Sequence, residues 1–558
     1  MRLVRASIET ANRVARRVLC GSRPRSGDEL LSLLRPLLVA FIAAVVTACG
    51  TIPPGADVPR ERTVALAQPD TTTLGKAFAE RIKQHAGLSG FRLLPAGTDG
   101  FVLRAEMTAA AERTIDLQYF IFHTDITGKL LLDELLKAAD RGVRLRMLLD
   151  DLNVRGDDTK IGVLAAHPNV EIRYFNPASY RGPLLPLRAT EFALNWKRLT
   201  YRMHNKLFLV DNTIGIAGGR NVGDEYFSTS KDFEFGDFDV FAVGPAVRSM
   251  SGSFDAYWNS ALAIPATALG TRPSEKALET FRADLVAHRQ KMADEEYMRA
   301  VAANNPLSAI VSGKDPLIWS RYQVLYDAPE KQKVEEGELD GRLLRERLIS
   351  EMRAVKRELL IVTPYLVPGE SQMKLLRDLR ASNVAVRILT NSLQSTDVPA
   401  VHAGYRKYRV PLLESGIELY EVRTYLGNPT LPRRGAPLKG DEADLFALHA
   451  KVFVFDRAKV FVGSANFDHR SFRLNTEVGV IIESAEIARQ VAQRFEAIVQ
   501  PANSYQVLLQ KAPDGSPALI WHTEEDGRVV DHTGEPGASI KRVLEVGLLS
   551  LLPIEDQL

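Results

Sequence analysis

Cysteine is almost absent from this sequence of 558 residues. Its two cysteines, Cys20 and Cys49, both lie within the first 49 positions, so no disulfide can link segments of the remaining chain. Hydrophobic residues make up 45% and charged residues 25% of the sequence, which is ordinary for a globular protein. The chain is therefore long enough for several domains or one large duplicated domain, with an apolar core in place of disulfides.

Long apolar runs are also missing. The run "LLVAFIAAVVTA" (37–48) has 12 residues, which is too short to cross a bilayer comfortably. It follows Arg35 and ends in small residues before Cys49, as an export signal does. The ending "VTAC" resembles a bacterial lipobox, which implies cleavage before Cys49 and acylation of that residue. An uncleaved N-terminal anchor is the alternative.

The lipobox resemblance predicts a location in the bacterial cell envelope. It implies that residues 1–48 are a signal peptide and that residues 49–75, rich in Pro, Thr and Gly, form a flexible tether. The mature protein would be a lipoprotein that faces the periplasm and is held to a membrane by Cys49. Gly50 resembles the residue found in outer-membrane-directed lipoproteins of enteric bacteria, so the outer membrane is a candidate.

A large excess of charge of one sign is lacking as well. The net charge is +2, and the first 48 residues carry eight arginines against three acidic residues. Without this segment, 63 basic and 66 acidic residues remain, a net charge of −3. Proteins that bind nucleic acid nonspecifically are usually basic, so no nucleic-acid partner is expected.

The residues that can carry chemistry occur in two copies of one pattern. The first copy consists of His204, Lys206, Asp211, Gly218, Gly219 and Asn221. The second copy repeats the spacing with His449, Lys451, Asp456, Gly463, Ser464 and Asn466. One such match can arise by chance, but a pair with the same offsets indicates a duplicated unit.

Each copy follows a matching series of expected elements. The residue pattern predicts a strand, a helix and a strand at 113–122, 127–142 and 143–151, and again at 357–367, 370–383 and 384–391. This order indicates helices that flank a largely parallel or mixed sheet. We therefore predict an α/β fold of two duplicated halves, at 76–300 with a linker and at 301–505. The segment 506–558 is expected to form a C-terminal cap, with Leu548, Leu549, Leu551 and Leu552 packed against the body rather than against a membrane.

The duplicated pattern suits a two-step substitution at phosphorus. Alternate residues of a strand share a face, so each histidine points the same way as its lysine. If two halves face each other across a pseudo-twofold axis, one histidine can attack while the other protonates the leaving oxygen. Two lysines and two asparagines can then hold the nonbridging oxygens without a metal or other cofactor. Asp239 and Glu477, which occupy similar places in the strands after each motif, could each hold one imidazole in its tautomer.

Both motifs resemble the H-x-K-x4-D signature of the phospholipase D superfamily, over about residues 80–505. More narrowly, "RMHNK", "GGRNVGDEYF", "FDV" and "SLLPIE" resemble the C-type branch of bacterial cardiolipin synthases. The resemblance implies two α/β/α sandwich halves with the active site between them. It also implies His204 as the nucleophile that forms a phosphohistidine, and His449 as the general acid and later base.

The same resemblance assigns roles to the other motif residues. Lys206, Lys451, Asn221 and Asn466 would bind the phosphate, Asp239 and Glu477 would orient the histidines, and Asp211 and Asp456 would support the geometry of the motif. Tyr119, Tyr365, Asp468 and Arg470 are further candidates for the cleft, with scaffold roles as the alternative.

The resemblance and the expected lipid anchor together predict a membrane-tethered phosphatidyltransferase. It would take a phosphatidyl group onto His204 and pass it to the hydroxyl of phosphatidylglycerol, which gives cardiolipin; phosphatidylethanolamine is a candidate second substrate. If water resolves the same intermediate, the enzyme is a phospholipase D, and a phosphodiesterase or nuclease is the third candidate. An inactive scaffold would show decay in one motif, whereas both motifs are whole.

Overall fold

The computed structural model describes residues 55–551 and Gln557, except for 155–157, 183, 231–232, 271–273, 294, 304 and 425–444. The expected signal peptide, Cys49 and the start of the tether lie outside these residues. Of the helices in the described segments, none combines the length and the apolar character that crossing a membrane requires.

The chain separates into two compact units. The smaller one includes residues 178–200, where α8 (Leu185–Leu194) and α9 (Trp196–Leu199) follow each other, and the Glu191 carboxylate accepts hydrogen bonds from the backbone N–H groups of Ser179 and Tyr180. The larger unit holds both copies of the motif and is described below.

The first half of the larger unit contains a mixed sheet. The strand order is β1 (Ser89–Leu94), β8 (Asp239–Val243), β6 (Ile214–Gly218), β5 (Leu207–Val210), β2 (Thr114–Tyr119), β3 (Arg144–Asp150), β4 (Val170–Phe175) and β9 (Ala263–Pro265). The three strands β2, β3 and β4 run parallel, and the other pairs are antiparallel. The order of elements along the chain confirms the strand, helix and strand expected at 113–122, 127–142 and 143–151.

The second half repeats this sheet strand by strand. The order is β10 (Ile318–Tyr326), β19 (Val478–Glu483), β17 (Lys459–Gly463), β16 (Val452–Phe455), β11 (Glu358–Val362), β13 (Ala385–Asn391), β14 (Glu418–Val422) and β20 (Ser504–Lys511). Strands β11, β13 and β14 are parallel, as their counterparts β2, β3 and β4 are. The duplication predicted from motif spacing therefore extends to sheet order and strand direction.

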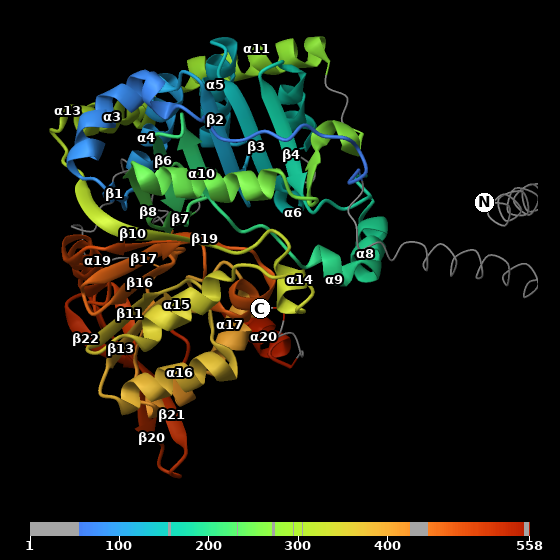
Figure 1. Cartoon of the computed structure of the whole chain (residues 1–558). Coiled ribbons are helices and arrows are strands. Elements are labelled where there is room, and N and C mark those ends of the chain that lie inside the picture. Colours follow the sequence, from blue (N-terminus) through green and yellow to red (C-terminus); the bar gives the residue numbers. More distant parts are fainter. Residues whose placement is uncertain are drawn as a thin grey trace, which may run out of the picture. The chain divides into compact units, whose positions relative to one another are not determined.

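Helices cover both faces of each sheet, which explains why the sheet residues are apolar on both sides. In the first half, α4 (Gly97–Ala110) and α5 (Ile126–Asp140) cover one face and α10 (Pro245–Trp258) the other. In the second half, α15 (Leu344–Arg353) and α16 (Gly369–Ala381) cover one face and α19 (Ala485–Ile498) the other. Figure 1 shows α10 and α19 on the inner sides of the two sheets, and both helices belong to one apolar core.

Strand β10 joins the two halves. Its first residues pair with β1 and its remainder with β19, so the two sheets are continuous through this strand (Figure 1). Short parallel strand pairings also connect the halves. Strand β7 (Phe233–Gly236) pairs with β15 (Leu445–Leu448), and Met203 forms an isolated β-bridge with Thr476. These pairings bring the segments next to the two motifs together.

The segment between the halves is helical, and it packs on the first half. It contains α11 (Glu275–Met292), α12 (Glu296–Ala303) and α13 (Pro306–Ser312). Leu278, Leu285, Leu307 and Ile310 lie in the core that α4 and α5 cover. Residue 75 lies in α3 (Thr73–Gln84), so the end of the expected tether is already folded.

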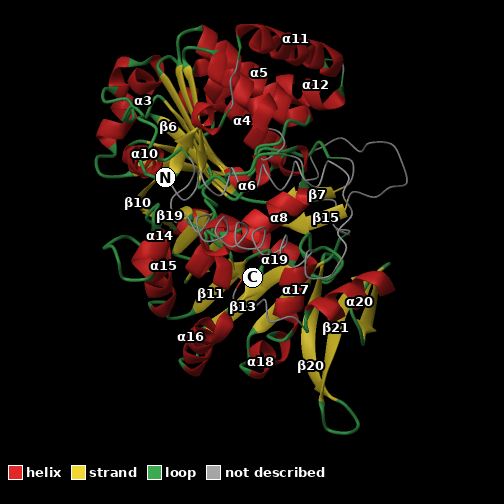
Figure 2. Ribbon diagram, turned by 90° about the vertical axis from the view of Figure 1, so that its right-hand side faces the viewer, coloured by secondary structure: helices red, strands yellow, loops and turns green. Residues whose placement is uncertain are grey.

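The C-terminal segment extends the second sheet. Strands β20, β21 (Pro517–Glu525) and β22 (Arg528–His532) continue the sheet beyond β14, and α20 (Ile540–Leu549) follows (Figure 2). Helix α20 packs on α17 (Pro399–Arg406). Leu548 and Leu551 are exposed and Leu549 is half-buried, so the expected burial of these leucines is wrong for the first two; Leu552 lies outside the described residues.

Candidate active site

Each motif forms the entry and the turn of a β-hairpin. His204 and Lys206 come directly before β5, and His449 and Lys451 come directly before β16. The hairpins β5–β6 and β16–β17 end in tight turns whose first residues, Asp211 and Asp456, have positive φ angles of 51° and 53°. The chemistry-bearing side chains thus sit at the ends of rigid, buried strands.

The two histidines are each held by a carboxylate from the other half. Nδ1 of His204 lies 2.9 Å from Oε2 of Glu477, and Nδ1 of His449 lies 2.6 Å from Oδ2 of Asp237. When Nδ1–H donates to a carboxylate, Nε2 keeps the lone pair that attacks or accepts a proton. Each half therefore supplies the carboxylate that orients the histidine of the other half.

The residue that holds His449 is Asp237, which corrects the prediction of Asp239. The Asp239 carboxylate accepts a hydrogen bond at 2.8 Å from the buried Arg104 guanidinium and accepts one from the Arg220 backbone N–H. The sheet register gives the reason. Gly218 pairs with Asp239 and its counterpart Gly463 pairs with Gly479, so the counterpart of Glu477 lies two residues before Asp239, at position 237.

The two lysines join the histidines in one electrostatic cluster. Lys206 Nζ donates to the His204 carbonyl at 2.6 Å, and Lys451 Nζ donates to the His449 carbonyl. Burial lowers the pKa of Lys451 to about 8 and that of Lys206 well below its usual value. Both ammonium charges, after burial itself, also lower the pKa of each imidazole. The two imidazoles and the two ammonium groups therefore influence one another within a single cluster.

The asparagines are placed differently in the two halves. Asn221 Oδ1 accepts from the Ile121 N–H, and its Nδ2 donates to the Tyr226 hydroxyl. The backbone N–H of Asn466 donates to the Ser471 hydroxyl. The side-chain Oδ1 of Asn466 is buried without a hydrogen-bond partner in the described residues. The predicted phosphate-binding role of the two amides stays a prediction.

The glycine turns differ because their carboxylates differ in length. A Cβ on Gly219 would lie 2.2 Å from Oδ1 of Asp237, so a side chain is excluded there. In the second half, the longer Glu477 leaves room for Ser464, whose hydroxyl donates to Glu477 Oε2. The sequence difference between "GGRN" and "GSAN" thus follows from the two different carboxylates.

Asp211 and Asp456 fix the backbone rather than face the imidazoles. The Asp211 carboxylate accepts hydrogen bonds from three successive backbone N–H groups, those of Glu112, Arg113 and Thr114. Asp456 accepts the equivalent bonds from Lys356, Arg357 and Glu358. Each aspartate ties its hairpin turn to the start of the neighbouring strand, β2 or β11.

We expect Asp211→Ala to lower the free energy of unfolding more than Asp456→Ala does. The Asp211 side chain is fully buried, whereas Asp456 is partly exposed, so the N–H groups freed by the second substitution can bond to water. The expected losses are about 2–4 and about 1–2 kcal/mol. Denaturant unfolding of both variants measures them, and equal losses would contradict the difference in burial.

The remaining cleft candidates have partners of their own. The Tyr119 hydroxyl accepts from Arg104, and Tyr365 donates to Asp397 at 2.8 Å. Asp468 accepts from the Ser471 N–H, and burial raises its pKa to about 6. Arg470 donates to the Gln557 carbonyl. Tyr119 therefore supports the Arg104–Asp239 pair, as a scaffold residue would.

Two aspartates outside the motifs position the catalytic segments, a role that the sequence did not indicate. The Asp150 carboxylate accepts the N–H of Met203, directly before His204, and Asp327 accepts the N–H of Glu477. Lys331 donates to Asp327 and to the carbonyl of Asn475, which fixes the backbone ahead of Glu477. Among the described residues, no group of three or more His, Cys, Asp and Glu side chains is placed to hold a metal ion.

The rate of phosphohistidine formation is expected to rise with pH up to about 7. Burial raises the pKa of the Glu477 carboxyl from 4.5 to about 7. Below that pH a protonated carboxyl donates to Nδ1 of His204 and leaves a proton on Nε2, the tautomer that cannot attack. Between pH 4.5 and 7 the folded chain holds a proton that the unfolded chain has lost, so this group makes the fold less stable as pH rises.

Single-turnover rates between pH 5 and 9 test this expectation. The rising limb should be absent in Glu477→Gln, which cannot titrate, and its plateau should be lower because an amide does not stabilise an imidazolium. A limb that persists unchanged in Glu477→Gln would assign the titration to another group.

Comparison with known proteins shows extended similarity. The family model described as "Cardiolipin synthase, PLD-like domain" matches residues 104–258 and 348–499. "Cardiolipin synthase C" of Escherichia coli is 36% identical over 484 residues, which cover 86% of this chain and 99% of that protein. An uncharacterized protein of Helicobacter pylori is 30% identical over 477 residues, 84% of this chain and 90% of that protein. The crystal structure of phosphatidylserine synthase from Haemophilus influenzae aligns with a TM-score of 0.51 at 13% identity, covering 87% of this chain and 100% of that chain, so it shows similarity of fold.

Proposed function

Because the chain belongs to the PLD-like family of cardiolipin synthases, we propose that it transfers a phosphatidyl group to the hydroxyl of phosphatidylglycerol and so forms cardiolipin. The observation that carries this proposal is the crossed arrangement in which Glu477 holds His204 and Asp237 holds His449. Two oriented imidazoles can supply a nucleophile and a proton carrier for one phosphodiester.

In the first step, Nε2 of His204 attacks the phosphorus of a phospholipid and the bond to the leaving alcohol oxygen breaks. His449 protonates that oxygen, so it takes part in this step as the imidazolium that Asp237 stabilises. In this scheme Lys206 and Lys451 stabilise the charge that the nonbridging oxygens gain in the pentacoordinate transition state. The roles of nucleophile and acid follow the family resemblance.

In the second step, the now neutral His449 takes the proton from the acceptor hydroxyl, which attacks the phosphohistidine. The bond from phosphorus to His204 breaks, and cardiolipin leaves. His204 and His449 are 6% and 5% exposed, so few water molecules can reach the intermediate. Exclusion of water favours transfer over hydrolysis.

The proposal includes attachment to a membrane. Acylation of Cys49 would hold the enzyme at the periplasmic side of the cell envelope, next to its lipid substrates. Phosphatidylglycerol is the acceptor in this scheme, and phosphatidylethanolamine is a candidate donor. Mass analysis of residue 49 in protein isolated from membranes tests the anchor independently of activity.

Product analysis tests the transfer reaction. Purified protein is incubated with labelled phosphatidylglycerol, with and without phosphatidylethanolamine, and the His449→Ala chain serves as the inactive control. We expect labelled cardiolipin and a free alcohol in equal amounts. Phosphatidic acid as the sole product would mean that water is the acceptor, and cleavage of single-stranded nucleic acid without lipid products would reject both lipid reactions.

A further inference from the structure

The C-terminal helix α20 exposes a continuous apolar stripe. Ile540, Leu544 and Leu548 are spaced by four residues, so they lie on one side of the helix, and Leu551 follows in the turn after the helix. Their side chains are 80%, 67%, 67% and 79% exposed, respectively. Single exposed apolar side chains are common on protein surfaces, but three on one helical face, followed by Leu551, indicate an interaction surface.

The opposite side of α20 is fixed to the body. Val546 is completely buried and packs with Leu393 and Ala403, while Val543 and Leu549 contact the same cluster. The Arg542 side chain also donates to the Thr396 carbonyl. Packing of this inner face against the body therefore keeps the apolar stripe on the outer face of the helix.

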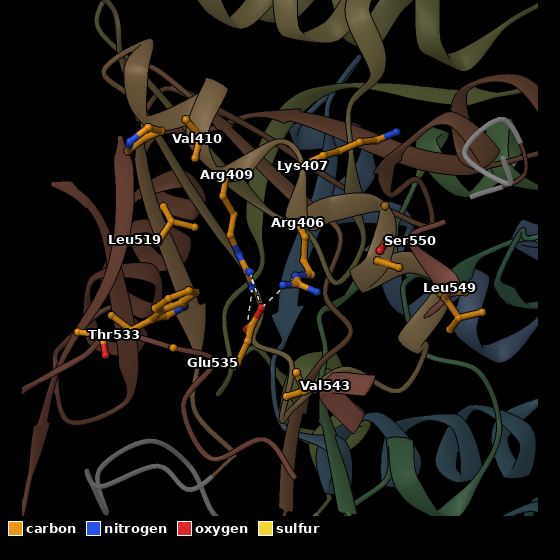
Figure 3. A pocket seen from close by; sticks show the side chains of 16 residues that line it. Arg406, Lys407, Arg409, Val410, Leu519, Thr533, Glu535, Val543, Leu549 and Ser550 are labelled. Atoms are coloured by element: carbon orange, nitrogen blue, oxygen red, sulfur yellow. Dashed lines mark hydrogen bonds and ion pairs between the residues drawn. The ribbon is translucent and has the colours of Figure 1, made fainter. Parts of the chain in front are cut away.

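A lysine lies next to the stripe. Lys541 is exposed beside Ile540, and Glu545 is the one acidic residue of the helix. Behind α20 lies a cavity of about 730 Å³, lined by Val543 and Leu549 on one side and by Arg406 and Lys407 on the other. Figure 3 shows Arg406 directed to Glu535, whereas Lys407 extends away from that carboxylate.

We propose that the outer stripe of α20 is a docking surface for an anionic phospholipid bilayer. Ile540, Leu544, Leu548 and Leu551 enter the boundary between headgroups and acyl chains, where a short amphipathic helix lies flat. The exposed Lys541, next to Ile540, supplies a cation for the headgroup phosphates. This surface is additional to the acyl anchor proposed for Cys49, and it does not depend on the transfer chemistry.

The size of the stripe favours a bilayer over a second copy of the chain. A stable protein–protein interface buries about 1,200–2,000 Å² in total, far more than three side chains of a ten-residue helix and Leu551 expose. Interfacial insertion needs only a short apolar face with cations at its border. A second copy remains the competing occupant, and the experiment below separates the two.

A fluorescent probe at position 548 tests the proposal in the full chain. Cys20→Ser and Cys49→Ser remove the native thiols and the acylation site, and Leu548→Cys then carries a nitrobenzoxadiazole label. The matched control carries the label at Val64→Cys, which is 53% exposed and lies ahead of the first half in the chain. The probes are vesicles of phosphatidylglycerol and phosphatidylcholine, some with brominated acyl chains, and vesicles of phosphatidylcholine alone.

With phosphatidylglycerol vesicles, we expect the label at 548 to shift to the blue and to be quenched by brominated chains, and the label at 64 to stay unchanged. Adding Leu544→Glu should weaken this quenching at least about tenfold. If the label at 548 showed neither the blue shift nor quenching, whether or not the chain bound to the vesicles, the proposal would be overturned. A blue shift that grows with protein concentration without vesicles would also overturn it, since a second copy would then cover the helix. Hydrolysis of a soluble phosphodiester by the same labelled chains reports the catalytic site separately.

Discussion

Replacing either His204 or His449 by alanine should reduce cardiolipin formation by about 10⁴-fold or more. The first substitution removes the nucleophile, and the second removes the group that protonates the leaving oxygen and later activates the acceptor. His522→Ala is the matched control, because this histidine is partly exposed and bonds to Asp531 in the C-terminal hairpin. The control should retain the rate of the unmodified chain, as measured by labelled lipid products.

The two histidine variants should separate on a substrate with a good leaving group. A nitrophenyl phosphodiester releases nitrophenolate without protonation, so His449→Ala should still form the phosphohistidine once per molecule. It should therefore release about one nitrophenolate per active site and then stop, because no base activates the acceptor. His204→Ala should release none. Equal bursts from both variants would contradict the division of roles.

The second large effect is expected at Asp237. Asp237→Asn keeps the shape of the side chain but replaces the acceptor of the Nδ1–H of His449, which should lower the turnover rate by about 10²–10⁴-fold. Asp239→Asn breaks the buried pair with Arg104 instead. That variant should lose about 3–5 kcal/mol of unfolding free energy, with the folded fraction still active.

Turnover and denaturant unfolding, measured side by side on the two variants, separate these effects. Glu477→Gln serves as a reference, since it removes the same kind of contact from His204 and should resemble Asp237→Asn. If Asp239→Asn lost turnover without losing stability while Asp237→Asn stayed active, the pairing seen in the structure would not be the catalytic one.

Much of the fold follows from the sequence because the duplication repeats local signals. The apolar alternation around both histidines and the helical spacing between the preceding strands occur twice, and each occurrence supports the other. Cys49 and the signal peptide lie outside the described residues, so the predicted anchor is not tested by the structure.

The carboxylate of His449 could not be identified from spacing alone. "FGDFDVF" offers two aspartates, Asp237 and Asp239, and the loop after Asn221 is longer than its counterpart after Asn466. Only the register of β8 on β6 decides between them, and register is a property of the paired strands. The signal was present as a second aspartate two residues earlier.

The crossing of the carboxylates also could not be predicted. Each histidine is bonded to a residue more than 200 positions away, and the contact depends on how the two halves meet. The exposure of Leu548 and Leu551 could not be predicted either. An apolar helix face is ordinarily buried, and only the packing of α20 on α17 shows which of its two apolar faces is covered.

The most direct test of the central claim, that imidazoles from different halves act on one phosphorus, is to trap the intermediate. His449→Ala is mixed with the nitrophenyl ester of phosphatidic acid, whose leaving group departs without protonation, and the mass of the intact protein is measured before peptides are mapped under conditions that preserve phosphohistidine. We expect a mass gain of one phosphatidyl group, located on His204 and absent from the His204→Ala, His449→Ala double variant. An adduct elsewhere on the chain, or the same adduct in the double variant, would contradict the claim.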